Sequence, residues 1–189
     1  DHPEILHAKK RKIPVIPRAL MLAELMRTKY SIAIAGSHGK TTTTSMIAHI
    51  LMQADLNPTV IIGGHLKNIS TNAQFGDGDF LVAEADESDR SLLNLHATIA
   101  IVTNIDLEHL DIYKDLEDII ATFKQFLNNL PFYGKAILCL DDPVIRSILP
   151  LSHLKIITYG FSEDADIYAK NVKLEKLSSS CTIYAHNKN

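Results

Sequence analysis

Residues 32–42 read IAIAGSHGKTT, an apolar run followed by two glycines three residues apart and a Lys-Thr-Thr sequence. The small and branched residues before Gly36 predict a buried strand, and apolar residues at helical spacing after Thr41 predict a helix. A loop that joins a strand to a helix N-terminus presents unpaired backbone amides to an anion, and the helix dipole adds to the attraction. The segment therefore predicts a phosphate-binding loop, with G-x-x-G-K-T spacing in place of the usual, longer G-x-x-x-x-G-K-T.

The residue types in this loop suit the phosphates of ATP. Glycines let the backbone approach a phosphate closely. Lys40 supplies a positive charge for the β- and γ-phosphates, and the Thr41 hydroxyl is a candidate ligand for Mg²⁺. The expected phosphate-binding residues are Gly36, Ser37, His38, Gly39, Lys40, Thr41 and Thr42. The alternative is a plain glycine turn before an ordinary helix, which leaves the Lys-Thr-Thr sequence unexplained.

Strands and helices alternate along the rest of the chain. The expected strands are residues 15–16, 31–35, 59–62, 80–85, 98–102, 136–140 and 156–159. The expected helices are residues 3–10, 18–28, 41–54, 116–130 and 143–149. Residues 167–174 and 182–184 predict a short terminal β-hairpin. This alternation predicts an α/β fold, a mostly parallel sheet flanked by helices around a P-loop-type nucleotide-binding core.

Composition narrows the class of protein. The chain has 189 residues, 46% of them hydrophobic, and its 19 basic and 22 acidic side chains give a formal net charge of −3. These values exclude a disordered chain and give no support to a nucleic-acid binder that works by bulk positive charge. The apolar stretches are too short to span a bilayer, and two distant cysteines fit a reduced compartment. We therefore expect a cytoplasmic protein with small-molecule substrates, and neither nucleic acid nor membrane as partner.

Two further polar clusters follow predicted strands. Glu84 is the first of four acids after the run FLVA, and ligands in open α/β sheets lie at the carboxyl ends of strands, so we expect Glu84 to bind Mg²⁺. His109 follows the next strand, in a cluster that begins at Asn104, and is a candidate for a second metal or a substrate contact. The alternatives are a solvated acidic loop and a structural histidine.

These motifs, in this order, resemble the Mur ligases. They are GSHGKTTTT at residues 36–44, EADESD at residues 84–89, TNI at residues 103–105 with His109 and Asp111, NLPFYG at residues 129–134, and DDP at residues 141–143. The resemblance implies that residues 1–29 are the tail of an N-terminal UDP-sugar-binding domain. It implies that residues 30–189 are a central ATP-binding domain, truncated at its C-terminal end, with the C-terminal domain absent. We therefore expect a piece of a longer enzyme that has no ligase activity alone.

The resemblance also implies a reaction. ATP activates the carboxylate of UDP-N-acetylmuramate as an acyl phosphate, which the amine of L-alanine attacks, a step of peptidoglycan precursor synthesis. Lys40 and His109 would be the catalytic residues. Thr41 and Glu84 would ligate one Mg²⁺ and His109 a second, and the UDP-sugar would contact Thr71 and Asn72.

Other interpretations stay open. A relative that recycles a murein tripeptide shares the loop, but there an aromatic residue is expected where this chain has Ser88. A nucleotide-dependent switch and a scaffold without catalysis are the alternatives from other classes. Lys124 is a candidate for the carbamylated lysine of some Mur ligases, although an exposed lysine is the commoner case.

Overall fold

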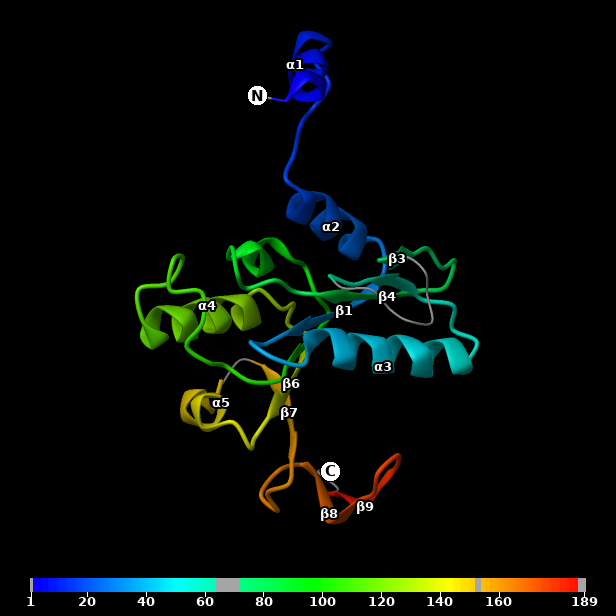
Figure 1. Cartoon of the computed structure of the whole chain (residues 1–189), viewed down its shortest axis with the longest axis vertical. Helices are drawn as coiled ribbons and strands as arrows, with labels where there is room; N and C mark the ends of the chain where they lie inside the picture. The colour runs from blue at the N-terminus through cyan, green and yellow to red at the C-terminus, as the bar shows by residue number, and fades with distance from the viewer. Residues whose placement is uncertain (1, 64–71, 152–153, 187–189) are drawn as a thin grey trace.

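The structure is a computed structural model that describes residues 2–63, 72–151 and 154–186. Within these residues, a nine-stranded sheet runs through the molecule in the order β3-β2-β4-β1-β5-β6-β7-β8-β9 (Figure 1). The strands are β1 (Tyr30–Ala35), β2 (Thr59–Ile61), β3 (Ala73–Gln74), β4 (Phe80–Glu84), β5 (Ile99–Val102), β6 (Lys135–Cys139), β7 (Lys155–Gly160), β8 (Ile167–Leu174) and β9 (Ser179–Ala185). The seven inner strands, β2-β4-β1-β5-β6-β7-β8 in spatial order, pair in parallel. At the two edges, β3 pairs with β2 and β9 pairs with β8, both antiparallel.

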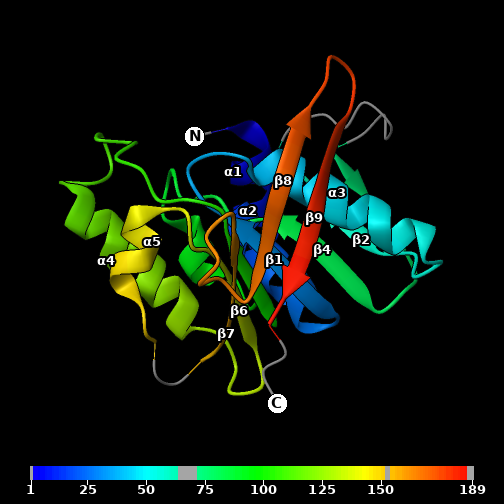
Figure 2. The same cartoon turned by 90° about the horizontal axis from the view of Figure 1, so that it is seen from below.

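Helices cover both faces of the parallel strands. They are α1 (Pro3–Lys10), α2 (Arg18–Arg27), α3 (Lys40–Gln53), α4 (Leu116–Asn128) and α5 (Pro143–Ile148), with a 3₁₀ helix, η1 (Ser91–Asn94). The predicted α/β fold with a mostly parallel sheet and a terminal hairpin is therefore confirmed. Figure 2 shows the β8–β9 hairpin as a long two-stranded ribbon. Among the described residues, no helix is long and apolar enough to cross a membrane.

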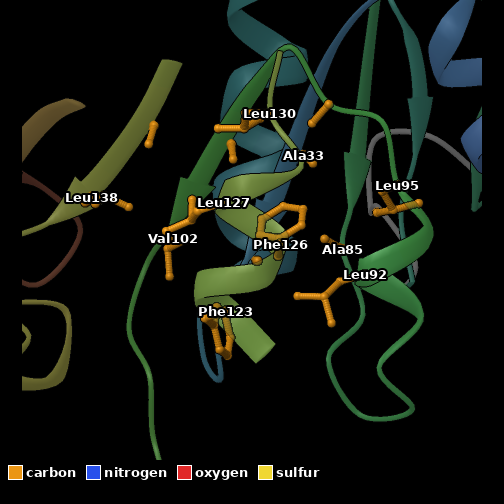
Figure 3. Close-up of a cluster of buried hydrophobic side chains, with 14 of the residues drawn as sticks. Ala33, Ala85, Leu92, Leu95, Val102, Phe123, Phe126, Leu127, Leu130 and Leu138 are labelled. Atoms are coloured by element: carbon orange, nitrogen blue, oxygen red, sulfur yellow. The ribbon is translucent and has the colours of Figure 1, made fainter. Parts of the chain in front are cut away.

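The alternation of side chains along the central strands assigns the helices to the two faces. In β1, Ile32 and Ile34 face a cluster that includes α3 residues, whereas Ala33 and Ala35 face the cluster formed by α2, α4 and α5. Small residues on that second face let large side chains from the helices approach the sheet. Figure 3 shows Phe123 and Phe126 of α4 among Ala33, Ala85 and Leu92.

Three details differ from the sequence-based expectation. The predicted strand at residues 15–16 is wrong: Val15 and Ile16 form no strand and are about half exposed, at 50% and 48%. Two prolines flank this pair, and it has no neighbouring strand to bond to. The apolar residues of helix α2 are typical of a helix with a broad buried face, yet Leu20, Met21 and Leu25 are exposed and only Ala23 and Met26 are buried. The short elements β3 and η1 were not predicted. Figure 1 shows α1 standing away from the body at the end of an extended segment.

Strand β1 lies at the centre of the sheet, between β4 and β5, and this position decides where the site forms. Ile34 of β1 is level with Glu84 of β4, and Ala35 is level with Val102 of β5. The loop after β1 therefore has the carboxyl ends of β4 and β5 on its two sides. This is the switch point at which open α/β sheets bind their ligands.

Candidate nucleotide-binding site

The loop that joins β1 to α3 has the backbone geometry that an anion site needs. Gly36 and Gly39 have φ of +132° and +83°, in the region that favours glycine. Gly39 is the N-cap of α3 and provides no side-chain hydrogen bond to the first turn of the helix. The amides of that turn are therefore left for a ligand, and the helix dipole favours a negative one. Residues 37–42 line a cavity of about 250 Å³ at this point.

The end of β5 holds this loop in shape. The amide of Asn104 donates from Nδ2 to the His38 carbonyl at 3.0 Å, and its Oδ1 accepts from the His38 N–H at 2.8 Å. Thr103 donates from Oγ1 to the same carbonyl at 2.7 Å. The backbone of the loop is thus bonded from outside by side chains, so its shape does not depend on a bound ligand. Sequence analysis placed Asn104 in a polar cluster without recognising this bracing role, for which the pattern gives no signal.

The ammonium of Lys40 lies inside the site and is paired. Its Nζ donates to Glu87 Oε1 at 2.6 Å and to the Gly36 and Ser37 carbonyls at 2.6 and 3.3 Å. The Lys40 side chain is 18% exposed and that of Glu87 is 4% exposed. A charged pair this sheltered from water is strongly coupled, because removal of one partner leaves the other charge buried alone.

Two neighbours fix Glu87 in place. Tyr113, a buried residue, donates its hydroxyl to the Glu87 carbonyl at 2.6 Å. Burial raises the pKa of the Tyr113 hydroxyl, so it stays protonated and able to donate. Arg90 packs its guanidinium over the Tyr113 ring at 4.6 Å and binds Asp118 Oδ2 at 2.5 Å. The acidic segment after β4 is therefore rigid at Glu87.

Glu84 and Lys40 line a second cavity, also of about 250 Å³, between α2 and the sheet. Its walls include Met21, Leu22 and Leu25 of α2, so two of the apolar side chains that α2 exposes, Met21 and Leu25, border this cavity. Arg18 and Gly63 complete this part of the lining. The cavity opens next to the phosphate loop and mixes apolar walls with carboxylates and a lysine.

The carboxylates present fit a divalent cation. Glu84 Oε1 and Glu87 Oε2 are buried, and neither has a hydrogen-bond partner among the described residues. Glu87, Glu108 and His109 each offer one ligand atom, and these atoms lie within 4.8 Å of one another. His109 Nε2 is 3.7 Å from Glu87 Oε1. Orphaned buried carboxylate oxygens are costly, and a cation such as Mg²⁺ would satisfy them.

The structure brings most of the predicted site residues together. The loop residues, Glu84 and His109 lie at one edge of the sheet, and His38 points to acids, with Nε2 at 3.5 Å from Glu108 Oε1. Asn72 is exposed and its carbonyl accepts from the Ile62 N–H at 2.9 Å; Thr71 lies outside the described residues. Lys124 is exposed on α4, in keeping with a surface lysine. Sequence analysis missed Glu87 as the partner of Lys40, and it missed Tyr113.

A glycine loop with this geometry, at the switch point of a parallel sheet and flanked by carboxylates, is typical of nucleotide-binding α/β domains. Comparison with known families specifies it further: the family described as "Mur ligase middle domain" matches residues 34–189, and the chain belongs to the Mur ligase family.

Individual relatives carry a consistent name. The chain is 60% identical over 173 residues to UDP-N-acetylmuramate–L-alanine ligase of Geotalea uraniireducens. The matched region covers 92% of this chain and 38% of that protein. The chain is 56% identical over all 189 residues to the enzyme of the same name from Geobacter sulfurreducens, and it covers 40% of that protein. The chain thus spans about two fifths of the length of these curated relatives.

Solved structures share the fold. UDP-N-acetylmuramate-alanine ligase from Thermotoga maritima superposes with a TM-score of 0.79 at 25% identity, covering 98% of this chain and 42% of that one. The UDP-N-acetylmuramate:L-alanyl-γ-D-glutamyl-meso-diaminopimelate ligase from Neisseria meningitides gives a TM-score of 0.80 at 23% identity, covering 96% and 60%. The second likeness is evidence of fold alone.

Proposed function

We propose that this chain is the ATP-binding part of a cytoplasmic ligase that joins L-alanine to the carboxylate of UDP-N-acetylmuramate through an acyl phosphate. Residues 30–189 would form the central ATP-binding domain and residues 1–29 the end of a UDP-sugar-binding domain. The observation that carries the proposal is the braced loop at residues 36–42 with Lys40 inside it and carboxylates on the neighbouring strand end. The relatives at 60% and 56% identity support L-alanine rather than a tripeptide as the second substrate.

The loop would hold the ATP phosphates. The amides at the start of α3 face outward from a rigid turn, so they would bind the phosphate oxygens without reorganising. Lys40 would bind the transferred phosphoryl group after its ammonium has released at least one of its present acceptors within the protein. Thr41 and Glu84 would hold one Mg²⁺ and His109 a second, and these ions would supply positive charge where an anionic carboxylate attacks an anionic phosphate. The orphaned Glu84 oxygen supports its part in this set.

The cavity between α2 and the sheet is where the acid substrate would approach. Glu84 and Lys40 form its polar end, and α2 forms its apolar wall. A carboxylate that enters here would be the phosphoryl acceptor and would meet the γ-phosphate of ATP at the loop, with bulk water partly excluded by α2. Thr71 and Asn72 remain our candidates for contacts to the UDP-sugar.

The experiment that tests the function uses the full-length ligase that contains this segment. ADP release is measured with UDP-N-acetylmuramate and ATP, with L-alanine, glycine, L-serine or a murein tripeptide as the amine. We expect L-alanine to be preferred and Lys40→Ala to abolish turnover. Preference for the tripeptide would transfer the assignment to a recycling ligase, and ADP release without any acid substrate would favour a nucleotide switch.

Glu84 has a separate test in the same assay. Glu84→Ala should raise the Mg²⁺ concentration needed for half-maximal rate by about tenfold or more, the loss that ~1.4 kcal/mol of binding represents. The exposed Glu117→Ala on α4 is the matched control and should leave the Mg²⁺ titration unchanged. A normal Mg²⁺ titration in Glu84→Ala would remove this residue from the metal site.

A further inference from the structure

The hydrogen-bonding capacity of the Lys40 ammonium is already used within the protein. A lysine ammonium has three N–H donors. Nζ of Lys40 has three acceptors within reach: the Gly36 carbonyl, the Ser37 carbonyl and Glu87 Oε1. To bind a phosphate, Lys40 must release at least one of them. The carboxylate is the strongest competitor, because it is the one acceptor of the three that carries a full negative charge.

Glu87 is the fixed member of this pair and Lys40 the movable one. Glu87 is 3% exposed, and its carbonyl is bonded by Tyr113 and by the Arg90 N–H at 3.0 Å. Lys40 has a flexible four-carbon stem and a more exposed side chain. When Lys40 turns toward a nucleotide, the buried Glu87 carboxylate therefore loses its 2.6 Å ion pair, and His109, with Nε2 at 3.7 Å from Oε1, remains beside it. Loss of the closer ion pair from a buried carboxylate is strongly unfavourable.

A divalent cation would neutralise the Glu87 carboxylate once Lys40 has turned away from it. Glu87 Oε2 is buried and has no hydrogen-bond partner in the described part of the chain. His109 and Glu108 also lie next to Glu87. His109 Nε2 is 3.7 Å from Oε1, the oxygen that binds Lys40, and one ligand atom from each of the three residues lies within 4.8 Å of the others. Carboxylate oxygens with an imidazole nitrogen are a donor set that suits Mn²⁺ and, with added waters, Mg²⁺.

We propose that Glu87 is a positioning residue that holds Lys40 away from phosphate until a divalent cation occupies the cluster of Glu87, Glu108 and His109. The cation neutralises the carboxylate of Glu87, and Lys40 then turns to the nucleotide. This proposal rests on the proposed nucleotide site. Its consequence is positive coupling between metal and nucleotide, because each removes a competitor of the other.

Mn²⁺ alone, added to the nucleotide-free chain, is the first probe. Lys40→Met keeps the length of the side chain but frees Glu87, so Mn²⁺ should bind at least about tenfold tighter than to the wild type, a difference of ~1.4 kcal/mol. Glu87→Gln should weaken Mn²⁺ binding by at least about the same factor. Binding is followed by electron paramagnetic resonance of free Mn²⁺, and circular dichroism checks that each variant is folded. Equal Mn²⁺ affinity in wild type and folded Lys40→Met would overturn the proposal.

ATP is the second probe, titrated calorimetrically with Mg²⁺ or with EDTA, and it remains decisive if Lys40→Met does not fold. In Glu87→Gln, Lys40 has lost its charged acceptor, so metal-free ATP should bind at least about tenfold tighter than to the wild type. The gain on adding Mg²⁺ should shrink. The exposed Glu117→Gln on α4 is the matched control: it removes the same charge away from Lys40 and the cluster, so it should change neither metal-free binding nor the Mg²⁺ gain.

The outcomes separate the two proposals. If the wild type binds ATP and Glu87→Gln binds metal-free ATP no more tightly, the role of Glu87 in withholding Lys40 is wrong and the nucleotide site stands. If the wild type binds no ATP with or without Mg²⁺, the nucleotide site of this chain is wrong. The Mn²⁺ comparison then still tests the competition between Lys40 and a metal for Glu87.

Discussion

Replacing Gly36 by alanine should damage the loop through a specific collision. A Cβ atom built on Gly36 would lie 2.1 Å from Thr103 Oγ1 and 3.0 Å from the Asn104 carbonyl oxygen. Real Cβ atoms do not approach other atoms to 2.1 Å, so either the loop or the end of β5 must move. The φ of +132° adds a second penalty, since residues with a side chain rarely adopt it.

The cost can be estimated from these two penalties. Backbone strain in such a region is worth about 1–3 kcal/mol. Displacing the Thr103 hydroxyl removes its 2.7 Å hydrogen bond to the His38 carbonyl, a net loss of about 0.5–1.5 kcal/mol. We therefore expect Gly36→Ala to lower the free energy of unfolding by about 2–4 kcal/mol.

Gly39→Ala is the matched control, because it changes the other glycine of the same loop. Gly39 has a φ of +83°, and a Cβ there meets nothing within 4 Å. Only the left-handed backbone penalty applies, about 1–2 kcal/mol. Urea unfolding followed by circular dichroism measures both variants. The reasoning is refuted if Gly36→Ala is no more destabilising than Gly39→Ala.

A double-mutant cycle isolates the collision itself. Thr103→Ala removes the atom nearest to the new Cβ and also the hydroxyl whose hydrogen bond is lost. Gly36→Ala combined with Thr103→Ala should therefore be less destabilising than the sum of the single changes, by about 1 kcal/mol or more. Strict additivity would mean that the alanine is accommodated without displacing Thr103.

Two further predictions use side chains around α4. Phe123 is fully buried, so Phe123→Ala should lower the free energy of unfolding in urea by about 3–5 kcal/mol. The control is Lys124→Ala at the exposed neighbouring position, which should change it by no more than about 0.5 kcal/mol. Similar losses in the two variants would contradict the packing described. The hydrogen bond from Arg90 holds the pKa of Asp118 below its ordinary value of 3.8. Its contribution to stability is therefore present above that value and is lost as pH falls through the lowered pKa. The stability difference between wild type and Asp118→Asn should shrink with acid over that window, and a difference that is constant down to pH 2 would contradict it.

The central strands could be predicted because each is buried on both faces. Ile32 and Ile34 alternate with Ala33 and Ala35, yet all four are apolar, so β1 reads as a continuous run in place of a polar–apolar alternation. The strand–loop–helix unit around residues 36–42 could be predicted because its glycines, lysine and threonines are adjacent in sequence.

The partner of Lys40 could not be predicted in the same way. Glu84 and Glu87 are acids of one short segment, and the sequence gives no reason to prefer the second. The choice depends on register: Glu84 ends β4 level with Ile34, whereas Glu87 lies in the turn beyond it. The pair at residues 15–16 illustrates the same limit, because a strand needs a neighbour that only the folded chain supplies.

The net charge of −3 and the pairing of Lys40 together indicate where the attraction for phosphate comes from. In the nucleotide-free protein the Lys40 charge is neutralised by Glu87 at 2.6 Å, so it adds little field at the loop. The standing attraction is then the uncapped start of α3, held open by Asn104 and Thr103. If Glu87 withholds Lys40 as proposed, such a site would select ligands by fit to oriented amides, and it would gain a full positive charge only when a metal and a nucleotide arrive together. The strongest electrostatic stabilisation would then be restricted to the complex in which the proposed phosphoryl transfer takes place.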